Sequence, residues 1–387
     1  MERSQGRTED SSAGERSHPR HARARRAPVV LGVACVVAIA TTARALPPGW
    51  YAPPENAKYA TEEVRVRSEA SLAGTLTLPS RWPATAGKRL RFPAVVMITA
   101  AGPQNRDHTP ADVLASLREG TPAYRPYYDL ADTLARRGIA SLRLDDRGVG
   151  ASMGMIDTTQ SLDRSVDTRA ALDYLRSRGE IDPRRIVLVG LGEGALNAML
   201  VAAGDSAVRG VVLMGCPAAP AGTGAVATLP SENGHDPGSA SARDSALAAS
   251  KSPDSGDPWT YFFRLFDPLA TARLVRVPAL VLQGGDDEVL PRETAARLSE
   301  ALRQSGNRDV TTHTFEGVTH EFLRAGAVTR GVPADSTSFH PPDAVLGAIA
   351  DWVAQRAGGP IVTTGPSTMP RAWRRAAQRR KAAGLKY

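Results

Sequence analysis

A run of alternating glycines between two apolar segments constrains the fold of this chain more than any other feature. Ile186–Val189 has the continuous apolar character of a buried strand. The chain then passes through Gly190, Gly192 and Gly194 into a segment rich in alanine, leucine and methionine, which favours helix. Strand, tight turn and helix form the setting of the G-x-S-x-G motif, in which a serine nucleophile sits on a strained turn. Gly192 occupies the serine position, so the pattern predicts the turn without its nucleophile.

Apolar runs alternate with amphipathic segments along most of the chain. This alternation predicts an α/β fold, with a mostly parallel central sheet covered by helices on both faces. We expect Asp182–Pro183 to break the chain before the strand that leads into the glycines. The expected strands are 64–66, 72–78, 93–100, 139–144, 186–189, 210–214, 278–282 and 310–315, and the expected helices are 127–137, 162–174, 195–203, 289–302 and 341–357.

The first 45 residues have the three-part pattern of an export signal. Residues 1–27 are polar and arginine-rich, residues 28–43 are uncharged and apolar, and Ala43-Arg44-Ala45 resembles a cleavage site. The apolar run of 16 residues is shorter than the roughly 20 that span a bilayer. We therefore expect cleavage near Ala45 and a secreted or periplasmic protein. Anchorage in the membrane by the uncleaved segment is the alternative.

Residues 46–357 are predicted to form the folded domain, which an insertion interrupts. From 217 to 258 the composition is dominated by alanine, glycine, serine, proline and aspartate, as in a flexible segment. An aromatic stretch, Trp259–Phe266, follows it. We assign the range 217–270 to the insertion. Residues 358–387 form a basic tail that we expect to be disordered.

The formal charge of +8 is confined to the ends of the chain. Residues 1–45 carry +4 and residues 356–387 carry +8, which leaves −4 on the part between them. The domain therefore lacks the basic surface that binding to nucleic acid requires, although the tail could contact an anionic surface. After cleavage Cys216 is the one remaining cysteine, so the mature chain forms no intrachain disulfide.

Three elements follow one another in the order nucleophile, acid, histidine. The first is the glycine turn, with Gly192 in the nucleophile position. The second is a loop after a predicted strand, in which Asp287, or its neighbour Asp286, supplies a carboxylate. The third is a loop before the last helix that carries His320. A carboxylate in this arrangement orients the histidine, which acts as a general base.

Two backbone N–H groups are candidates for an oxyanion hole. One belongs to Ala101, on the loop after the strand 93–100, and the other to Glu193, which follows the nucleophile position. Both are main-chain donors, so the loss of a serine side chain leaves them in place. Cys216 is a weak alternative nucleophile, because a lone cysteine usually packs in the core. The sequence has no metal-ligand cluster, phosphate-binding loop or dinucleotide fingerprint, so we expect neither metal nor cofactor.

Several stretches together resemble the α/β-hydrolase superfamily, in its bacterial esterase/thioesterase-like and serine-aminopeptidase-like group. The resemblance covers roughly residues 60–356, a range typical of such enzymes. It implies the roles of acid for Asp287 and base for His320, a lid in the insertion, and a G-H-S-E-G-G pattern whose serine is replaced by Gly192. The stretches are AGPQNRDHT (101–109), LRLDDRGVGAS (142–152), IDPRRIVLVGLGEGA (181–195), FDPLATARLVRVPALVLQGGDDEVLP (266–291) and EGVTHEF (316–322).

The resemblance implies a hydrolase of carboxylic esters or thioesters with a small acyl ligand. Glycine carries no group that could form an acyl intermediate, so we expect a degenerate or weakly active protein. One alternative is an active hydrolase in which His320 and Asp287 activate water. The other is a non-catalytic protein that binds a ligand or a partner. The sequence predicts neither the substrate nor the oligomeric state.

Overall fold

The computed structural model divides the chain into two units, 1–42 and 43–387, and only the second contains residues whose structure is described. The predicted export signal, nearly all of the predicted insertion and most of the basic tail therefore lie outside the described residues. The described residues are 50–55, 57, 59–79, 88–110, 124–155, 159, 161–218, 266–304, 306–326, 328–329, 332–333 and 339–364.

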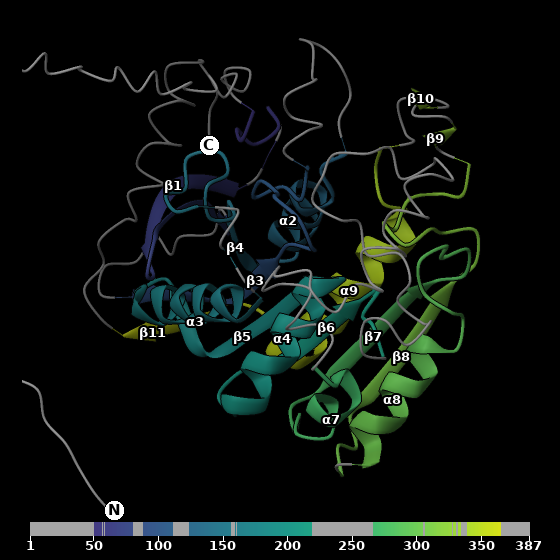
Figure 1. The fold of residues 1–387 in the computed structure, drawn as a ribbon. Coiled ribbons are helices and arrows are strands. Elements are labelled where there is room, and N and C mark those ends of the chain that lie inside the picture. Colours follow the sequence, from purple (N-terminus) through teal and green to yellow (C-terminus); the bar gives the residue numbers. More distant parts are fainter. Residues whose placement is uncertain are drawn as a thin grey trace, which may run out of the picture. The chain divides into compact units, whose positions relative to one another are not determined.

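A twisted sheet of nine strands forms the centre of the described region (Figure 1). Its strand order is β1-β2-β4-β3-β5-β6-β7-β8, and β11 pairs with β3 outside this path. Neighbours from β4 to β8 run parallel, whereas β1–β2, β2–β4 and β11–β3 are antiparallel. The strands are β1 (Tyr59–Arg67), β2 (Ser71–Pro79), β3 (Lys88–Ile98), β4 (Ala140–Leu144), β5 (Ile181–Leu191), β6 (Gly210–Met214), β7 (Ala279–Gly284), β8 (Val310–Phe315) and β11 (Ile361–Thr364). A separate pair consists of β9 (Val328–Thr329) and β10 (Val332–Pro333).

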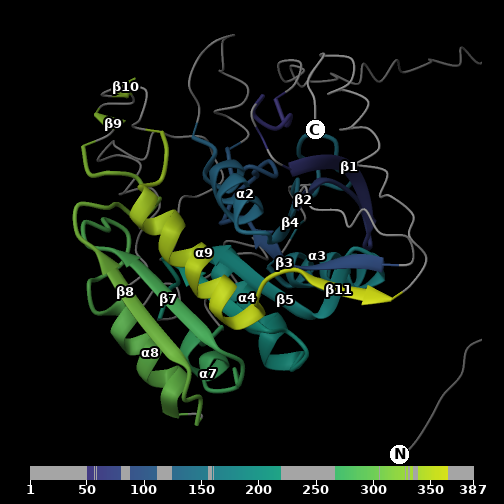
Figure 2. The same cartoon turned by 180° about the vertical axis from the view of Figure 1, so that it is seen from behind.

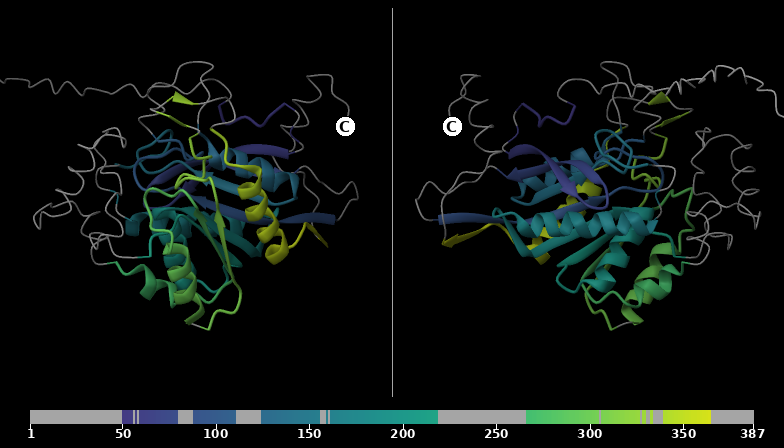
Figure 3. Two further views of the ribbon diagram at one scale, coloured as in Figure 1. Left: turned by 90° about the vertical axis from the view of Figure 1, so that its right-hand side faces the viewer. Right: turned by 60° about the vertical axis from the view of Figure 1, so that its left-hand side comes forward.

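Helices cover both faces of the sheet, which confirms the predicted α/β architecture. One apolar cluster joins the sheet to α3, α4, α7 and α8, and a second joins the opposite face to α2 and α9 (Figure 2). Figure 3 shows β1 and β2 at one edge of the sheet and β7 and β8 at the other. The helices are α2 (Pro126–Arg136), α3 (Ser161–Ser177), α4 (Glu193–Gly204), α7 (Pro268–Ala272), α8 (Thr294–Gln304) and α9 (Asp343–Ala357). None of these helices combines the length and the apolar character needed to cross a membrane.

The structure differs from the sequence prediction at several elements. The prediction that Asp182–Pro183 breaks the chain before the strand is wrong. β5 begins at Ile181, and Asp182–Pro183 lies within it. Phe92 pairs with Ile181, and a register irregularity follows before Ala94 pairs with Ile186. Such an irregularity accommodates the proline, which has no N–H for the ladder.

At the C-terminal end of the domain, the sheet continues past residue 357, where the sequence analysis placed the start of the tail. Ile361–Thr364 pairs antiparallel with the start of β3, from Arg91 back to Lys88. Within the range 217–270 that was assigned to the insertion, Pro268–Ala272 forms α7, which begins at an N-cap. The Asp267 carboxylate accepts hydrogen bonds from the N–H groups of Leu269 and Ala270.

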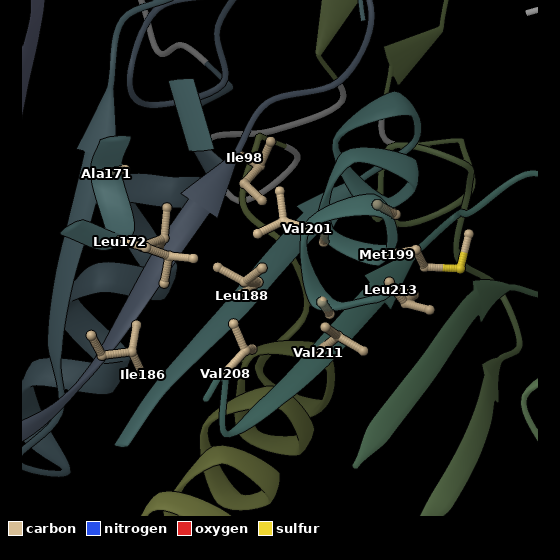
Figure 4. Packing of buried hydrophobic residues seen from close by; sticks show 14 of the residues in the cluster. Ile98, Ala171, Leu172, Ile186, Leu188, Met199, Val201, Val208, Val211 and Leu213 are labelled. Carbon is tan, nitrogen blue, oxygen red and sulfur yellow. The ribbon is translucent and has the colours of Figure 1, made fainter. Parts of the chain in front are cut away.

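The glycine turn packs backbone against backbone. A Cβ atom placed on Gly190 would lie 2.1 Å from the Gly194 carbonyl oxygen, and one placed on Gly194 would lie 2.2 Å from the Ile98 carbonyl oxygen. Only glycine permits these approaches, because any side chain would overlap main-chain atoms. Figure 4 shows the core beneath this contact, where Ile98, Leu188 and Val201 gather between β3, β5 and α4. The outer two glycines therefore set the distance between α4 and the sheet.

Substitution of these glycines tests this packing. We expect Gly194→Ala to lower the free energy of unfolding by about 3 kcal/mol or more, because the new methyl group cannot be accommodated without backbone movement. Chemical denaturation measures the change. Gly204→Ala is the matched control, since a Cβ at the last residue of α4 meets nothing within 4 Å. If both variants are as stable as the wild-type protein, the close approach at Gly194 is not a constraint.

Candidate active site

Gly192 lies at the tip of a sharp turn between β5 and α4. Its backbone angles are φ 55° and ψ −117°, a strained combination for any residue with a side chain. A Cβ atom placed there would lie 3.4 Å from the Ala100 Cβ and 3.9 Å from the His320 Nε2. Both are ordinary van der Waals distances. Position 192 therefore has the geometry of a nucleophile elbow, with room for a small side chain that faces a histidine.

His320 and Asp287, far apart in the sequence, form a hydrogen-bonded pair. The His320 Nδ1 lies 3.0 Å from the Asp287 Oδ2. The other carboxylate oxygen, Oδ1, accepts hydrogen bonds from the N–H groups of Val289 at 2.9 Å and Leu290 at 2.8 Å. The Asp287 side chain is 1% exposed. The carboxylate is thus held through both of its oxygens. It keeps the proton of the His320 imidazole on Nδ1, which leaves Nε2 directed toward position 192.

The structure distinguishes the two candidate acids. Asp287 contacts His320, whereas Asp286 donates its main-chain N–H to the Val318 carbonyl oxygen at 3.0 Å. Asp287 is therefore the residue placed to act as the acid of the proposed pair.

His320 is more basic than an ordinary histidine. Burial by itself would lower the pKa of His320, but the hydrogen bond that His320 donates to Asp287 and the negative charges of Glu321 and Asp287 outweigh it and raise the pKa above its usual value. The imidazole is 12% exposed, so solvent screens these charges only in part. A raised pKa suits a group that must accept a proton near neutral pH.

The loop after β3 passes directly over the elbow. Ala100 contacts position 192, as described above, and Ala101 follows it. Arg164, near the start of α3, holds this loop by donating to the carbonyl oxygens of Ala100 at 3.2 Å and Gly102 at 2.8 Å. Ala101 thus lies between two anchored residues, on the loop where the sequence placed an oxyanion-hole donor.

Glu193 begins α4, so its main-chain N–H is at the positive end of the helix dipole. Its side chain is buried and turned toward α3. The Glu193 carboxylate accepts a hydrogen bond from the Ser161 hydroxyl and forms an ion pair with Arg164 at 3.8 Å. The main chain of Glu193, rather than its carboxylate, is therefore the part available to the oxyanion position.

Cys216 follows β6 but has none of the features of a nucleophile. It is buried, and burial raises the pKa of its thiol well above the usual value. A thiol in such surroundings stays protonated and unreactive. Among the described residues, no group of three or more histidine, cysteine or acidic side chains could hold a metal ion.

Sequence reasoning missed a buried arginine that supports the loop after β3. The Arg106 guanidinium donates to both oxygens of Asp145, at 3.1 and 2.8 Å, and to Thr75 at 2.8 Å. Its side chain is 2% exposed and that of Asp145 is fully buried. Arg147, two residues after Asp145 in the sequence, forms a separate ion pair with Asp167 at 2.8 Å. Asp145 and Arg147 therefore serve the scaffold. The sequence signal for Arg106 lies only in the stretch AGPQNRDHT.

His108, Tyr124 and Glu321 were also missed. His108 lies on the loop after β3, Tyr124 just before α2, and Glu321 beside His320. The three side chains meet behind the site. No spacing in the sequence brings these segments together, so only the tertiary structure could reveal them.

Comparison with known proteins finds one matching family model and two curated relatives. A family model described as serine aminopeptidase, S33, matches residues 121–229. An uncharacterized protein, YfhR of Salmonella typhimurium, is 34% identical over 73 residues, which are 19% of this chain and 24% of that protein. YfhR of Salmonella typhi is 28% identical over 186 residues, which are 46% of this chain and 55% of that protein. The matches thus span between a quarter and about half of the length of these relatives.

Solved structures show the same fold over a longer range. Est1E of Butyrivibrio proteoclasticus with bound ferulic acid superposes with a TM-score of 0.50 at 18% identity, covering 76% of this chain and 96% of that one. The α/β hydrolase GrgF of Penicillium sp. sh18 superposes with a TM-score of 0.50 at 18% identity, covering 77% of this chain and 99% of that one. The esterase Pf2001 of Pyrococcus furiosus superposes with a TM-score of 0.50 at 14% identity, covering 79% of this chain and 94% of that one. The chain has the α/β-hydrolase fold, and its residues 121–229 match the serine aminopeptidase family model.

We expect Asp287→Asn to lower the pKa of His320. The amide oxygen can still accept from Val289 and Leu290, but the negative charge beside the imidazole is lost. Folding favours the protonated form of a histidine whose pKa is raised, so the stabilisation is complete below about pH 6.5 and is lost as the pH rises through the folded-state pKa. At pH 5 the free energy of unfolding should fall by about 1–3 kcal/mol.

NMR titration of the imidazole and denaturation at several pH values measure these effects. Asp286→Asn is the matched control and should change neither the pKa of His320 nor the free energy of unfolding. An equal change in both variants would remove the distinction between the two carboxylates.

Proposed function

We propose that this protein is an esterase-type α/β hydrolase that binds an acyl ester or thioester and has lost the covalent route of its superfamily. The observation that supports the proposal most directly is the distance of 3.9 Å between the His320 Nε2 and a Cβ placed on Gly192. A serine there could bring its hydroxyl within hydrogen-bond distance of the base. The base, its carboxylate and the loop after β3 are arranged around a position that lacks only the nucleophile.

Glycine at position 192 removes covalent catalysis without disturbing the fold. The turn requires a positive φ, which costs any residue with a side chain about 1–3 kcal/mol and costs glycine almost nothing. Loss of the serine in a serine hydrolase lowers kcat by about 10⁶-fold, and the remaining rate comes from the oxyanion hole and from binding. We therefore expect the wild-type protein to bind ester ligands and to hydrolyse them very slowly.

Direct hydrolysis by water is the second candidate. It is favoured by the intact pair of His320 and Asp287 and by the raised pKa of the imidazole. In this route His320 Nε2 removes a proton from a water molecule, which attacks the carbonyl carbon of the ester, and the same proton then passes to the leaving alkoxide. No acyl-enzyme would accumulate.

The ester substrate class rests on the fold neighbour Pf2001, which is named an esterase, and on the resemblance of the sequence to the esterase/thioesterase-like group. Within the superfamily, lids set the choice of substrate, and here the predicted lid, 217–270, lies almost wholly outside the described residues. We therefore propose carboxylic esters and thioesters as a class and no particular acyl chain.

Restoring the serine tests the proposal. We expect Gly192→Ser to raise kcat/KM on short acyl esters by about 10²-fold or more, because it supplies the one missing group. A panel of p-nitrophenyl esters and acyl thioesters measures the change. Gly192→Ala is the matched control, since it introduces the same backbone strain without a hydroxyl, and it should gain nothing.

Three outcomes distinguish the functions. If Gly192→Ser gains activity that His320→Ala then abolishes, the proposal stands. If the wild-type protein already hydrolyses esters well and His320→Ala abolishes that activity, direct hydrolysis by water replaces the proposal of a nearly inactive protein. If no variant hydrolyses or binds acyl compounds, the protein is a non-catalytic binding or interaction protein.

We also propose that the chain is exported and cleaved after Ala45, on the basis of the three-part pattern of residues 1–45. Mass spectrometry of the protein expressed in a bacterial host should find a mature N-terminus at Leu46 in the exported fraction. An exported protein that still begins at Met1 would contradict cleavage, and its recovery in the membrane fraction would favour the anchored alternative.

A further inference from the structure

Two residues of the described structure combine a side chain with a positive φ, and they lie on the two loops that meet at the site. His108, on the loop after β3, has φ 64°, and Phe322, two residues after His320, has φ 56°. Such conformations persist only where the surrounding structure enforces them, and they concentrate at functional sites. The contacts of His108 show what enforces its conformation.

The His108 imidazole joins the two loops. Its Nδ1 accepts a hydrogen bond from the Ala100 main-chain N–H at 3.4 Å, and its Nε2 lies 3.5 Å from the Glu321 Oε2. A main-chain N–H can only donate, so Nδ1 must be the acceptor and the proton of the neutral ring resides on Nε2. This tautomer directs the Nε2–H toward the Glu321 carboxylate. The imidazole is 1% exposed, so the His108 side of this contact is shielded from solvent.

Aromatic side chains near α2 surround the same pair. The Tyr124 hydroxyl donates to the Glu321 main-chain oxygen at 2.5 Å and lies 3.4 Å from its carboxylate. The Tyr127 ring packs against the His108 ring with centroids 5.0 Å apart, and its hydroxyl donates to the Ile98 carbonyl oxygen at 2.6 Å. His108 is therefore held in place by the end of β3 and by α2.

Glu321 acts electrostatically on its neighbour. Its negative charge, together with that of Asp287, raises the pKa of His320, as described above. Burial opposes ionisation of Glu321, but hydrogen bonding to His108 and the nearby imidazoles lower the pKa of its carboxyl below the usual value. The Glu321 side chain is 49% exposed, so without a partner it could turn toward solvent and carry its charge away from His320.

We propose that His108 is a positioning residue that holds the Glu321 carboxylate beside His320 and fixes the oxyanion loop to the loop of the base. The inference rests on the proposed function, in which His320 is the base. His108 itself touches no reacting atom. It acts through Glu321, and its contact with Ala100 ties this action to the residue that faces position 192.

The conformation of His108 provides a test that preserves the fold. His108→Gly removes the imidazole at a φ that glycine adopts freely, so the full-length variant should keep the backbone conformation of the loop. We expect NMR titration to show the pKa of His320 shifted downward. Glu321→Gln should shift it in the same direction. If His108 acts through Glu321, the double variant should shift it no further than Glu321→Gln alone.

Two results would overturn the proposal: an unchanged pKa of His320 in His108→Gly, or an equal further fall when His108→Gly is added to Glu321→Gln. If His108→Gly does not fold, His108→Asn gives the same test, because asparagine tolerates a positive φ and lacks Nε2. These titrations need no hydrolysis. A failure of Gly192→Ser to gain activity would therefore count against the proposed function alone.

Discussion

The arrangement of this site depends on the close approach of two main-chain segments at Gly190 and Gly194. The first glycine permits the turn to fold back on itself, and the second lets α4 begin against the end of β3. A side chain at either position would push α4 away from the sheet. Position 192 would then lose its contact with the loop after β3, and its distance to His320 would change. Position 192 itself holds a glycine, so this packing does not depend on a side chain there.

The candidate site residues come from loops that follow different strands of one parallel arrangement. The loop after β3 carries Ala101, the turn after β5 carries Gly192, the loop after β7 carries Asp287 and the loop after β8 carries His320. The carboxyl ends of parallel strands meet at one edge of a sheet, where ligands bind in open α/β folds. Buried ion pairs such as those of Arg106 and Arg164 then hold the first of these loops in place.

Sequence patterns predicted most of the elements, because continuous apolar runs and helical periodicity both reflect burial. They also predicted His320, with Asp287 or Asp286 as its partner, because the order of the loops along the chain is fixed by the fold. They did not predict that β5 runs through Asp182–Pro183 or that Ile361–Thr364 adds a strand to β3. Both features depend on pairing with a distant strand that compensates for a weak local preference.

The sequence by itself determined the fold class, the glycine turn and the absence of a serine at position 192, since these follow from local residue types and their order. Only the tertiary structure decided which carboxylate bonds to His320, that the Glu193 side chain turns toward α3, and that His108 and Glu321 meet behind the site. These contacts join segments separated by 32 to more than 200 residues. Side-chain direction and loop conformation set them, and neither is encoded in the periodicity of a single segment.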